Sequence, residues 1–180
     1  LSKTPVWGGG YRYSLLYSVS PEFRGSNVNA WGRDASYQLA ALHMITGILK
    51  EAAAIKGVEP DPRWQDVADH LPQFSGVNVS LSPEVQGKMV DRIGLWSNMD
   101  LPCSHRYHSH LAGIYPFCTI DPDDSLYYDI VRESVQHWIK EGSGAWSGWS
   151  IPWASVIHSR MGNNEAAVAW LHYWKALYTN

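Results

Sequence analysis

Apolar residues recur at helical spacing in several segments, and this periodicity constrains the fold more than any other feature. Leu39, Leu42, Ile45 and Leu49 follow one another at intervals of three or four residues. The segment 165–178 repeats this pattern with alanine, tryptophan and leucine. Such spacing places apolar side chains on one face of an α-helix, where they pack against another element. The sequence therefore predicts an all-α fold.

Residues that start and stop helices predict five helices and the position of a short sixth. Proline and acidic residues are favoured in a first turn, and glycine commonly follows a last turn. By these signals the helices begin at Asp34 or Ser36, Pro62, the acidic segment 121–124, Ser150 and Glu165, and end at Gly57, His70, Gly142, Met161 and Tyr178. The sixth would run from His108 to Tyr115. Short turns between these helices predict helical hairpins.

Two parts of the chain lack this helical pattern. Residues 1–33 are rich in glycine, serine, proline and aromatic residues, which predicts an irregular segment with a short strand or extended loop over residues 11–19. Alternating apolar and polar residues predict a brief strand from Asn78 to Leu81. Residues 82–104 are expected to be mostly loop, with a helical turn after Pro83.

The composition favours a folded protein that binds neither nucleic acid nor membrane. The chain has 180 residues, of which 45% are hydrophobic, and its formal net charge is -3. This is enough apolar material for a core, and it leaves no basic footprint for a polyanion. No segment approaches the roughly 18 apolar residues that a membrane span needs. The first residues, Leu-Ser-Lys, show no leader sequence, so localisation stays unknown from the sequence.

Tryptophan and tyrosine are unusually abundant. The sequence holds 10 of each against 3 phenylalanines, so the excess lies in rings that carry a polar group. A flat apolar face with one hydrogen-bonding group suits a sugar, whose ring has an apolar C–H face bordered by hydroxyls. The alternative is that most of these rings fill gaps between helices.

The first cluster that could carry chemistry is Ser18-Val19-Ser20-Pro21-Glu22. A glutamate that follows a proline in an aromatic loop is not explained by helical patterning. It is either a functional carboxyl group or an ordinary surface carboxylate.

The second cluster is Ser104-His105-Arg106-Tyr107-His108-Ser109-His110-Leu111. So many polar groups need partners if they are buried, because an unpaired buried polar group costs roughly 1–3 kcal/mol. They are expected to donate hydrogen bonds to ligand hydroxyls or to a carboxylate. A metal site is the less favoured alternative: the ligand types are present, but their spacing matches no standard zinc signature, so no metal ligand is assigned. The side chains concerned are Cys103, His105, His108, His110 and Cys118. The two cysteines form either a disulfide or a pair of buried free thiols.

The third cluster is a glycine-rich and tryptophan-rich loop, residues 144–153. Glycine permits tight turns, and Trp146, Trp149 and Trp153 are candidates for a flat platform under a sugar ring. The alternative is a structural loop whose tryptophans pack inward.

Taken together and in this order, these clusters resemble the catalytic domain of glycoside hydrolase family 95, which contains α-L-fucosidases and some α-L-galactosidases. The family motifs are S-P-E-N, H-R-H-x-S-H-L with Y-P shortly after, G-W-S-x-A-W, and A-R-L-G. The matching segments are Ser20-Pro21-Glu22-Phe23, His105-Arg106-Tyr107-His108-Ser109-His110-Leu111 with Tyr115-Pro116, Gly148-Trp149-Ser150-Ile151-Pro152-Trp153, and Ser159-Arg160-Met161-Gly162. The resemblance covers most of the chain, from about Ser18 to Trp170.

The resemblance implies an inverting glycosidase that needs no cofactor. Glu22 corresponds to the family's general acid, which donates a proton to the leaving oxygen. His105, Arg106, His110 and Trp149 are expected to contact the substrate or to support the residues that do. A general acid must stay protonated, which an apolar setting favours. The side chains expected to supply that setting are Tyr11, Tyr13, Tyr17 and Phe23.

The resemblance also implies that residues 1–180 are one partial catalytic domain. The fold would be an (α/α)6 barrel, and five or six helices make up about half of it. The family's catalytic base lies outside the matched motifs, so the chain is expected to pair with the remainder of its own barrel. The expected substrate is an oligosaccharide or polysaccharide with a terminal α-L-fucosyl or α-L-galactosyl residue. Secretion or a periplasmic location would fit the resemblance.

Two alternatives remain from the sequence. Tyr107 stands where the family has its second histidine, and Phe23 stands where it has asparagine. These departures motivate a carbohydrate-binding relative that has lost catalysis. The other alternative is an enzyme of the same barrel type with different chemistry, either a phosphorylase or a lyase.

Overall fold

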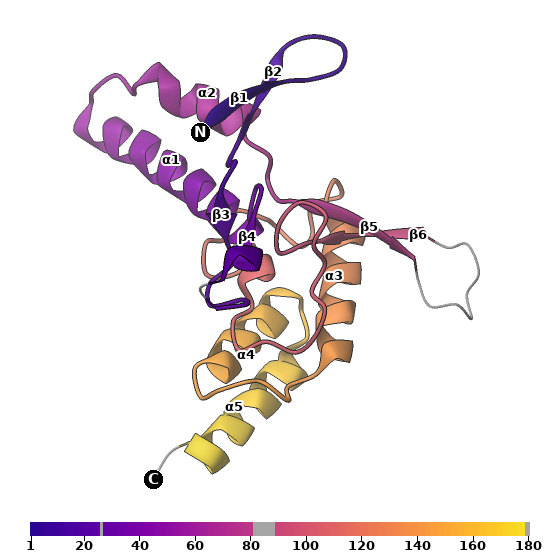
Figure 1. The fold of residues 1–180 in the computed structure, drawn as a ribbon. Helices are drawn as coiled ribbons and strands as arrows, with labels where there is room; N and C mark the ends of the chain where they lie inside the picture. Colours follow the sequence, from indigo (N-terminus) through magenta and orange to yellow (C-terminus); the bar gives the residue numbers. More distant parts are fainter. Residues whose placement is uncertain (26, 81–88, 179–180) are drawn as a thin grey trace.

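The structure, a computed structural model, describes residues 1–25, 27–80 and 89–178 (Figure 1). The helices in these residues are α1 (Ser36–Lys56), α2 (Pro62–His70), α3 (Tyr128–Glu141), α4 (Ser150–Arg160) and α5 (Asn164–Tyr178). The strands are β1 (Ser2–Pro5), β2 (Tyr11–Ser14), β3 (Ser18–Val19), β4 (Trp31–Gly32), β5 (Gly76–Ser80) and β6 (Met89–Ile93). Two short 3-10 helices are η1 (Val28–Ala30) and η2 (Ser109–Leu111).

The strands form three antiparallel pairs, so the expectation of an all-α chain is corrected. β1 pairs with β2, β3 with β4, and β5 with β6. The predicted strand at Asn78 is confirmed as part of β5, whereas β6 lies in the stretch expected to be mostly loop. In that pair, Val77 lies opposite Arg92 and Gly76 opposite Ile93. Leu81 and the turn expected after Pro83 lie outside the described residues.

Four of the helices form two hairpins, as the short turns predicted. The two hairpins lie at opposite ends of the molecule (Figure 1). α1 packs on α2, and α4 packs on α5. Gly57 ends α1 in the left-handed conformation, with φ of 65°, and its N–H donates to the carbonyls of Ala53 and Ala54. Glycine adopts this conformation without a steric penalty, which is why it stops the helix here.

The start of α1 differs from both predicted caps. The capping position is Ala35, which makes no side-chain hydrogen bond. Asp34 is instead buried, and it accepts hydrogen bonds from the Ser14 hydroxyl at 2.8 Å and the Leu15 N–H at 2.6 Å. Arg12 also reaches this carboxylate, at 3.2 Å. Asp34 therefore ties the N-terminal segment to the head of α1, which satisfies a buried charge that would otherwise be costly.

α3 begins later than the acidic segment predicted. Asp121 and Asp124 accept local backbone hydrogen bonds in turns, from the N–H groups of Asp123 and Leu126. Asp and Ser residues favour such turns because their side chains replace a backbone acceptor. The helix starts at Tyr128 once these turns are complete. Likewise, the predicted helix from His108 to Tyr115 shrinks to the 3-10 turn η2.

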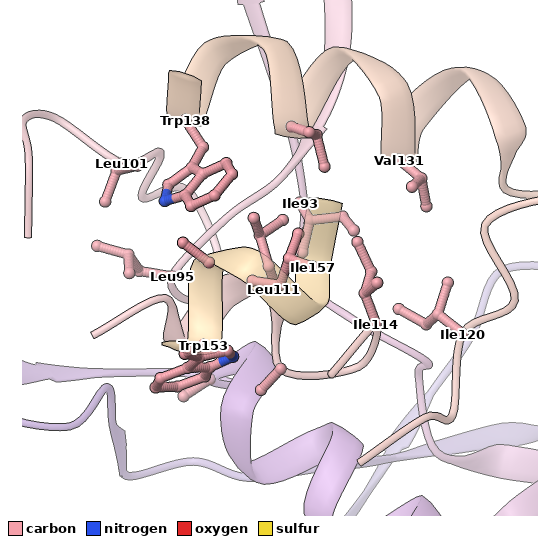
Figure 2. Packing of buried hydrophobic residues seen from close by; sticks show 14 of the residues in the cluster. Ile93, Leu95, Leu101, Leu111, Ile114, Ile120, Val131, Trp138, Trp153 and Ile157 are labelled. Carbon is pink, nitrogen blue, oxygen red and sulfur yellow. The ribbon is translucent and has the colours of Figure 1, made fainter. Parts of the chain in front are cut away.

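The main apolar core lies between α3, α4 and the segment 93–120 (Figure 2). Figure 2 shows Trp138 and Val131 pointing from α3 toward Ile157 of α4. Leu111 and Ile114 are fully buried between them. Each side chain of this size contributes roughly 1.5–3 kcal/mol when it is buried. This core fixes the His105–Leu111 segment against two helices.

Apolar side chains also remain exposed on the two hairpins. The exposed residues of this kind are Ile45, Ile48, Leu49 and Ile55 on α1, and Val168, Leu171, Tyr173, Leu177 and Tyr178 on α5. Within residues 1–25, 27–80 and 89–178 the helices form no closed barrel (Figure 1). The half-barrel therefore remains a prediction.

The structure also answers two smaller questions that the sequence raised. In the part of the chain that the structure describes, no helix is both long and apolar enough to span a membrane. Cys103 and Cys118 are free thiols, and both are exposed rather than buried.

Candidate functional site

The loop that carries Glu22 lies against the histidine-rich segment, although the two are far apart in the sequence. The hydroxyl groups of Ser20 and Ser109 share a buried hydrogen bond. Two residues further on, the Glu22 carboxylate accepts hydrogen bonds from the Arg106 guanidinium. The first two sequence clusters are thus joined by one neutral and one charged contact.

Arg106 directs two donors at a single oxygen of Glu22. Its Nε–H donates to Oε2 at 2.7 Å, and its Nη2–H donates to the same oxygen. About half of each side chain is exposed, 51% for Arg106 and 49% for Glu22. The Arg106 hydrogen bonds lower the pKa of Glu22 below its ordinary value, and a hydrogen bond from Tyr107 acts in the same direction. The carboxyl group is therefore ionised in this arrangement.

The backbone at Glu22 is strained, which indicates that its position is imposed by the surrounding loop. Its φ is 53°, in the left-handed region that residues with a side chain rarely adopt. Such a conformation costs of order 1–3 kcal/mol. Turn hydrogen bonds on either side hold it, from the Phe23 N–H to the Ser20 carbonyl and from the Gly25 N–H to the Glu22 carbonyl. Strain of this kind is common where a side chain must point at a ligand.

The apolar setting predicted around Glu22 is wrong for three of its four residues. Tyr11 and Tyr13 donate their hydroxyl hydrogen bonds to Asp66 of α2. Tyr17 is 79% exposed, with its ring edge toward Trp31. Contact with α2 therefore holds Tyr11 and Tyr13 away from Glu22, and Tyr17 faces solvent and Trp31.

Phe23 is the one ring of that predicted set that lies next to the histidine segment. It is buried, and it packs edge-on against Trp96 and His105, at centroid distances of 5.6 and 5.5 Å. Phe23 therefore anchors the loop and leaves its neighbour Glu22 exposed.

Three hydrogen bonds fix the histidine segment to α3 and α4. The Ser150 hydroxyl donates to the Arg106 carbonyl at 2.6 Å. His108 Nε2 donates to the Ser150 carbonyl at 2.9 Å, and the Trp138 indole N–H donates to His108 Nδ1 at 3.0 Å. Because an indole nitrogen can only donate, the His108 proton must sit on Nε2. Burial lowers the pKa of His108 to about 4, so the ring is neutral.

The other two histidines of the segment differ in exposure, and neither lines the cavity described below. His105 is half-buried, and its Nδ1 accepts a hydrogen bond from the Tyr107 N–H at 3.1 Å. His110 is only 3% exposed, and its two ring nitrogens have no hydrogen-bond partner. Burial lowers the pKa of His110 to about 3. Of the two roles expected for these histidines, their absence from the cavity lining favours support of the loop over contact with a ligand.

An aromatic cavity of about 590 Å³ lies beside the ion pair. It is lined by five aromatic residues together with prolines and a valine: Pro21, Tyr37, Tyr107, Tyr115, Pro116, Trp149, Pro152, Trp153 and Val156. Pro21 and Tyr107 are the sequence neighbours of Glu22 and Arg106, so the charged pair adjoins the cavity. This size suits one or a few sugar rings.

The tryptophans of the third cluster divide between the cavity and the core. Trp149 is 69% exposed and lines the cavity, so its role as a sugar platform stays a prediction. Trp153 also lines it, and its indole N–H donates to the Tyr115 carbonyl at 2.7 Å. Trp146 instead stacks on Trp138 at 5.3 Å, so it belongs to the packing alternative.

Two aromatic rings of the cavity were missed by sequence reasoning. Tyr37 comes from the first turn of α1, and Tyr115 precedes a proline across a cis peptide bond. Nothing in the sequence around Tyr37 marks it as a site residue, because the other residues of the cavity come from distant segments that only the fold brings next to α1. Tyr115 is part of a quoted motif, which was the available signal.

No group of three or more metal-ligating side chains could hold a metal ion among the residues that the structure describes. The side chains at and beside the cavity supply a carboxyl group, a guanidinium, phenolic hydroxyls and aromatic faces. This set can bind a sugar ring and exchange one proton with it.

Comparison with protein families decides the assignment. The model of the glycosyl hydrolase family 95 catalytic domain matches residues 10–179. The chain belongs to glycosyl hydrolase family 95. None of the curated proteins compared with the chain matches it. As a family 95 catalytic domain, this chain is part of a glycoside hydrolase, and its substrate is a carbohydrate.

Proposed function

We propose that the protein hydrolyses a terminal α-L-fucosyl or α-L-galactosyl residue with inversion, and that Glu22 protonates the leaving oxygen. The observation that carries this proposal is the position of Glu22. Its carboxylate accepts hydrogen bonds from Arg106, the sequence neighbour of Tyr107, and it directly follows Pro21; Tyr107 and Pro21 both line the aromatic cavity. It is thus the carboxyl group best placed to meet a sugar bound there.

The aromatic rings bind the apolar face of the sugar. Trp149 presents an exposed flat surface, and Trp153 and Tyr107 form the adjoining wall. Arg106 and the Tyr107 hydroxyl donate hydrogen bonds to substrate oxygens. His105 and His110 hold this loop in place rather than touch the sugar, which narrows the role expected for them.

Proton transfer requires that the Glu22–Arg106 pair opens. In the ion pair the carboxylate holds no proton, because Arg106 lowers its pKa. When substrate oxygens take over the guanidinium hydrogen bonds, the pKa of Glu22 rises toward its ordinary value. The protonated carboxyl group then donates to the glycosidic oxygen. The catalytic base of an inverting enzyme lies about 6.5–9.5 Å away, across the sugar ring.

We place that base outside this segment, on the remainder of the barrel. Neither Asp nor Glu is among the described residues that line the cavity. The exposed apolar faces of α1 and α5 offer the surface against which further helices would pack.

Turnover by the protein in its full natural length tests this proposal. It should hydrolyse an aryl α-L-fucoside or α-L-galactoside, and NMR should show the inverted anomer first. On the corresponding methyl glycoside, whose alkoxide leaving group needs a proton, Glu22→Gln should lose about 10²–10⁴-fold in kcat, the usual contribution of a general acid. Glu59→Gln, in the loop between α1 and α2, is the matched control and should keep full activity. Failure on both aryl substrates, or full activity of Glu22→Gln on the methyl glycoside, would overturn the proposal.

One observation favours a second candidate, a carbohydrate-binding relative without catalysis. The ion pair keeps Glu22 ionised, and an ionised carboxyl group cannot act as an acid. In that case calorimetry should show glycan binding with no hydrolysis over days. Turnover that depends on phosphate would instead assign a phosphorylase, and an unsaturated product absorbing in the ultraviolet would assign a lyase.

A further inference from the structure

We propose that Arg106 binds the carboxylate of an acidic sugar, a hexuronate on the leaving-group side of the cavity, and that this carboxylate displaces Glu22. The inference deepens the proposed function, because the role of Glu22 as acid is what defines the leaving-group side. It adds a substrate class, a glycan in which the terminal sugar is attached to a uronate.

The Arg106 guanidinium can donate one hydrogen bond to each oxygen of a carboxylate, but Glu22 accepts both on a single oxygen. Arg106 Nε–H and Nη2–H both converge on one oxygen of Glu22, rather than on the two oxygens of a parallel bidentate pair. A planar carboxylate that approaches freely can accept one hydrogen bond on each oxygen, which is the stronger arrangement. Glu22 approaches less freely, because its own backbone is strained at φ of 53°. An incoming carboxylate can therefore compete for these hydrogen bonds.

The backbone of Arg106 is held in place, while its charged end is accessible. Its carbonyl accepts a hydrogen bond from the buried Ser150 at 2.6 Å, and its guanidinium lies 5.8 Å from the Tyr107 ring centroid. Yet 51% of the side chain is exposed. An accessible cation on an anchored backbone beside an aromatic cavity matches a ligand that has both a sugar ring and a carboxylate.

Neutral sugars fit this site less well than acidic ones. A hydroxyl group that replaces Glu22 leaves the guanidinium without its counter-charge, whereas a uronate carboxylate restores it. The exchange breaks two N–H···O bonds to Glu22 and forms two to the ligand. Glu22, no longer paired and now next to a second anion, takes up a proton from solvent. Uronate binding therefore protonates Glu22, and this is the proton that the general acid must donate.

Calorimetry with simple sugars tests the inference without requiring turnover. The probes are D-glucuronate and D-galacturonate, each compared with its neutral parent, D-glucose or D-galactose, at pH 6. We expect each uronate to bind at least about tenfold more tightly than its parent. Repeating the titration in buffers of different ionisation enthalpy should show proton uptake with the uronates only. Acetate, which has the carboxylate but no ring, should bind far more weakly than either uronate.

Three variants assign the effect to this ion pair. Arg106→Met should abolish the preference for uronates. Arg63→Met is the matched control, because Arg63 of α2 also forms an exposed ion pair, with Asp61, but lies outside the cavity lining. This variant should retain the preference for uronates. Glu22→Gln should bind uronates more tightly than the wild type and take up no proton, because the competing carboxylate is gone. This last variant keeps the test informative if Arg106→Met does not fold.

Equal affinity for uronates and their parents would overturn the inference. So would an acetate affinity equal to that of the uronates, a preference that survives Arg106→Met, or weaker uronate binding by Glu22→Gln. These outcomes are independent of the proposed hydrolysis. A protein that prefers uronates but cleaves no fucoside or galactoside would disprove the proposed hydrolysis and support the uronate site. A protein that cleaves one of these substrates but shows no preference for uronates would support the hydrolysis and disprove the uronate site.

Discussion

Arg106 sets the protonation state of Glu22 through two hydrogen bonds to one carboxylate oxygen. A carboxyl group held in this way is ionised down to a lower pH than a free glutamate, because its charged form is stabilised. The same contact that aligns the side chain thus opposes its use as an acid until the pair opens. The Glu22 carboxylate and the substrate oxygens therefore compete for the hydrogen bonds of the Arg106 guanidinium.

Replacing Arg106 should change the pH dependence of turnover. In the Arg106→Met variant the pKa of Glu22 rises toward its ordinary value, so the protonated form persists to higher pH. The alkaline limb of the kcat/KM profile, measured with an aryl glycoside, should therefore move to higher pH. Arg63→Met should leave the limb in place. A limb that stays unmoved in Arg106→Met would show that Arg106 does not control the acid.

Trp149 should contribute to binding and not to stability. Its side chain is 69% exposed on the cavity wall, so Trp149→Ala removes contact area for a sugar but little buried area from the fold. We expect affinity to fall roughly tenfold or more, as for other aromatic contact residues. Urea denaturation should show stability within about 0.5 kcal/mol of the wild type. An unchanged affinity would remove Trp149 from the site.

At the scale of elements, His108 holds together three parts of the molecule. It joins the loop of the site to Trp138 of α3 and to the Ser150 carbonyl at the start of α4. These hydrogen bonds satisfy both of its ring nitrogens in the neutral form. Protonation would replace the acceptor Nδ1 with a second donor that faces the Trp138 N–H, so the arrangement depends on a neutral ring.

Acid should destabilise the fold because His108 and His110 are buried and neutral. Their folded pKa values are about 4 and about 3, below the ordinary 6.5. The unfolded chain therefore binds more protons between these limits, so stability is full above pH 6.5 and is lost as pH falls. We expect a loss of roughly 2 kcal/mol for each histidine between pH 7 and pH 5.

Urea denaturation at the two pH values measures this loss. Replacing the exposed His172 of α5 with glutamine is the matched control, and it should leave the difference unchanged. Equal stability at pH 7 and pH 5 would contradict the assignment of two buried neutral rings.

The sequence predicted elements whose signals are local and missed those that depend on tertiary contacts. The bounds of α2 were predicted to the residue, because Pro62 and Pro72 punctuate it. β6 was missed, because its pairing with β5 is set by long-range contacts. α3 started late because the aspartates that signal a helix start were used in turns.

The same distinction explains the site. The motif order predicted that Glu22 and the histidine segment belong together, and their ion pair brings them into contact. The sequence could not show that Tyr11 and Tyr13 pair with Asp66, because that contact depends on how β1 and β2 lie on α2. It also could not show that His110 is sealed in the core.

At the scale of the whole molecule, the exposed apolar faces of α1 and α5 allow the proposed partial barrel to be tested. Ile48 and Leu171 are 53% and 45% exposed. If further helices cover them in the full-length protein, a charge at either position should destabilise that protein by roughly 1–3 kcal/mol. In residues 1–180 alone, Ile48→Glu and Leu171→Glu should change stability by less than about 0.5 kcal/mol.

Parallel denaturation of the full-length protein and of residues 1–180 makes this comparison. Lys140→Glu, a charge change on α3, serves as the control in both. Small effects of Ile48→Glu and Leu171→Glu in both forms would show that no barrel covers these faces.

The leaving-group dependence of Glu22→Gln tests the central claim most directly. Fluoride departs with little need for a proton, whereas an alkoxide needs one. On α-L-fucosyl fluoride, or the α-L-galactosyl fluoride, the variant should react at nearly the wild-type rate. On the corresponding methyl glycoside it should be slower by about 10²–10⁴-fold. Equal losses on both substrates would contradict the account, because they would show that Glu22 does not supply the proton to the leaving oxygen.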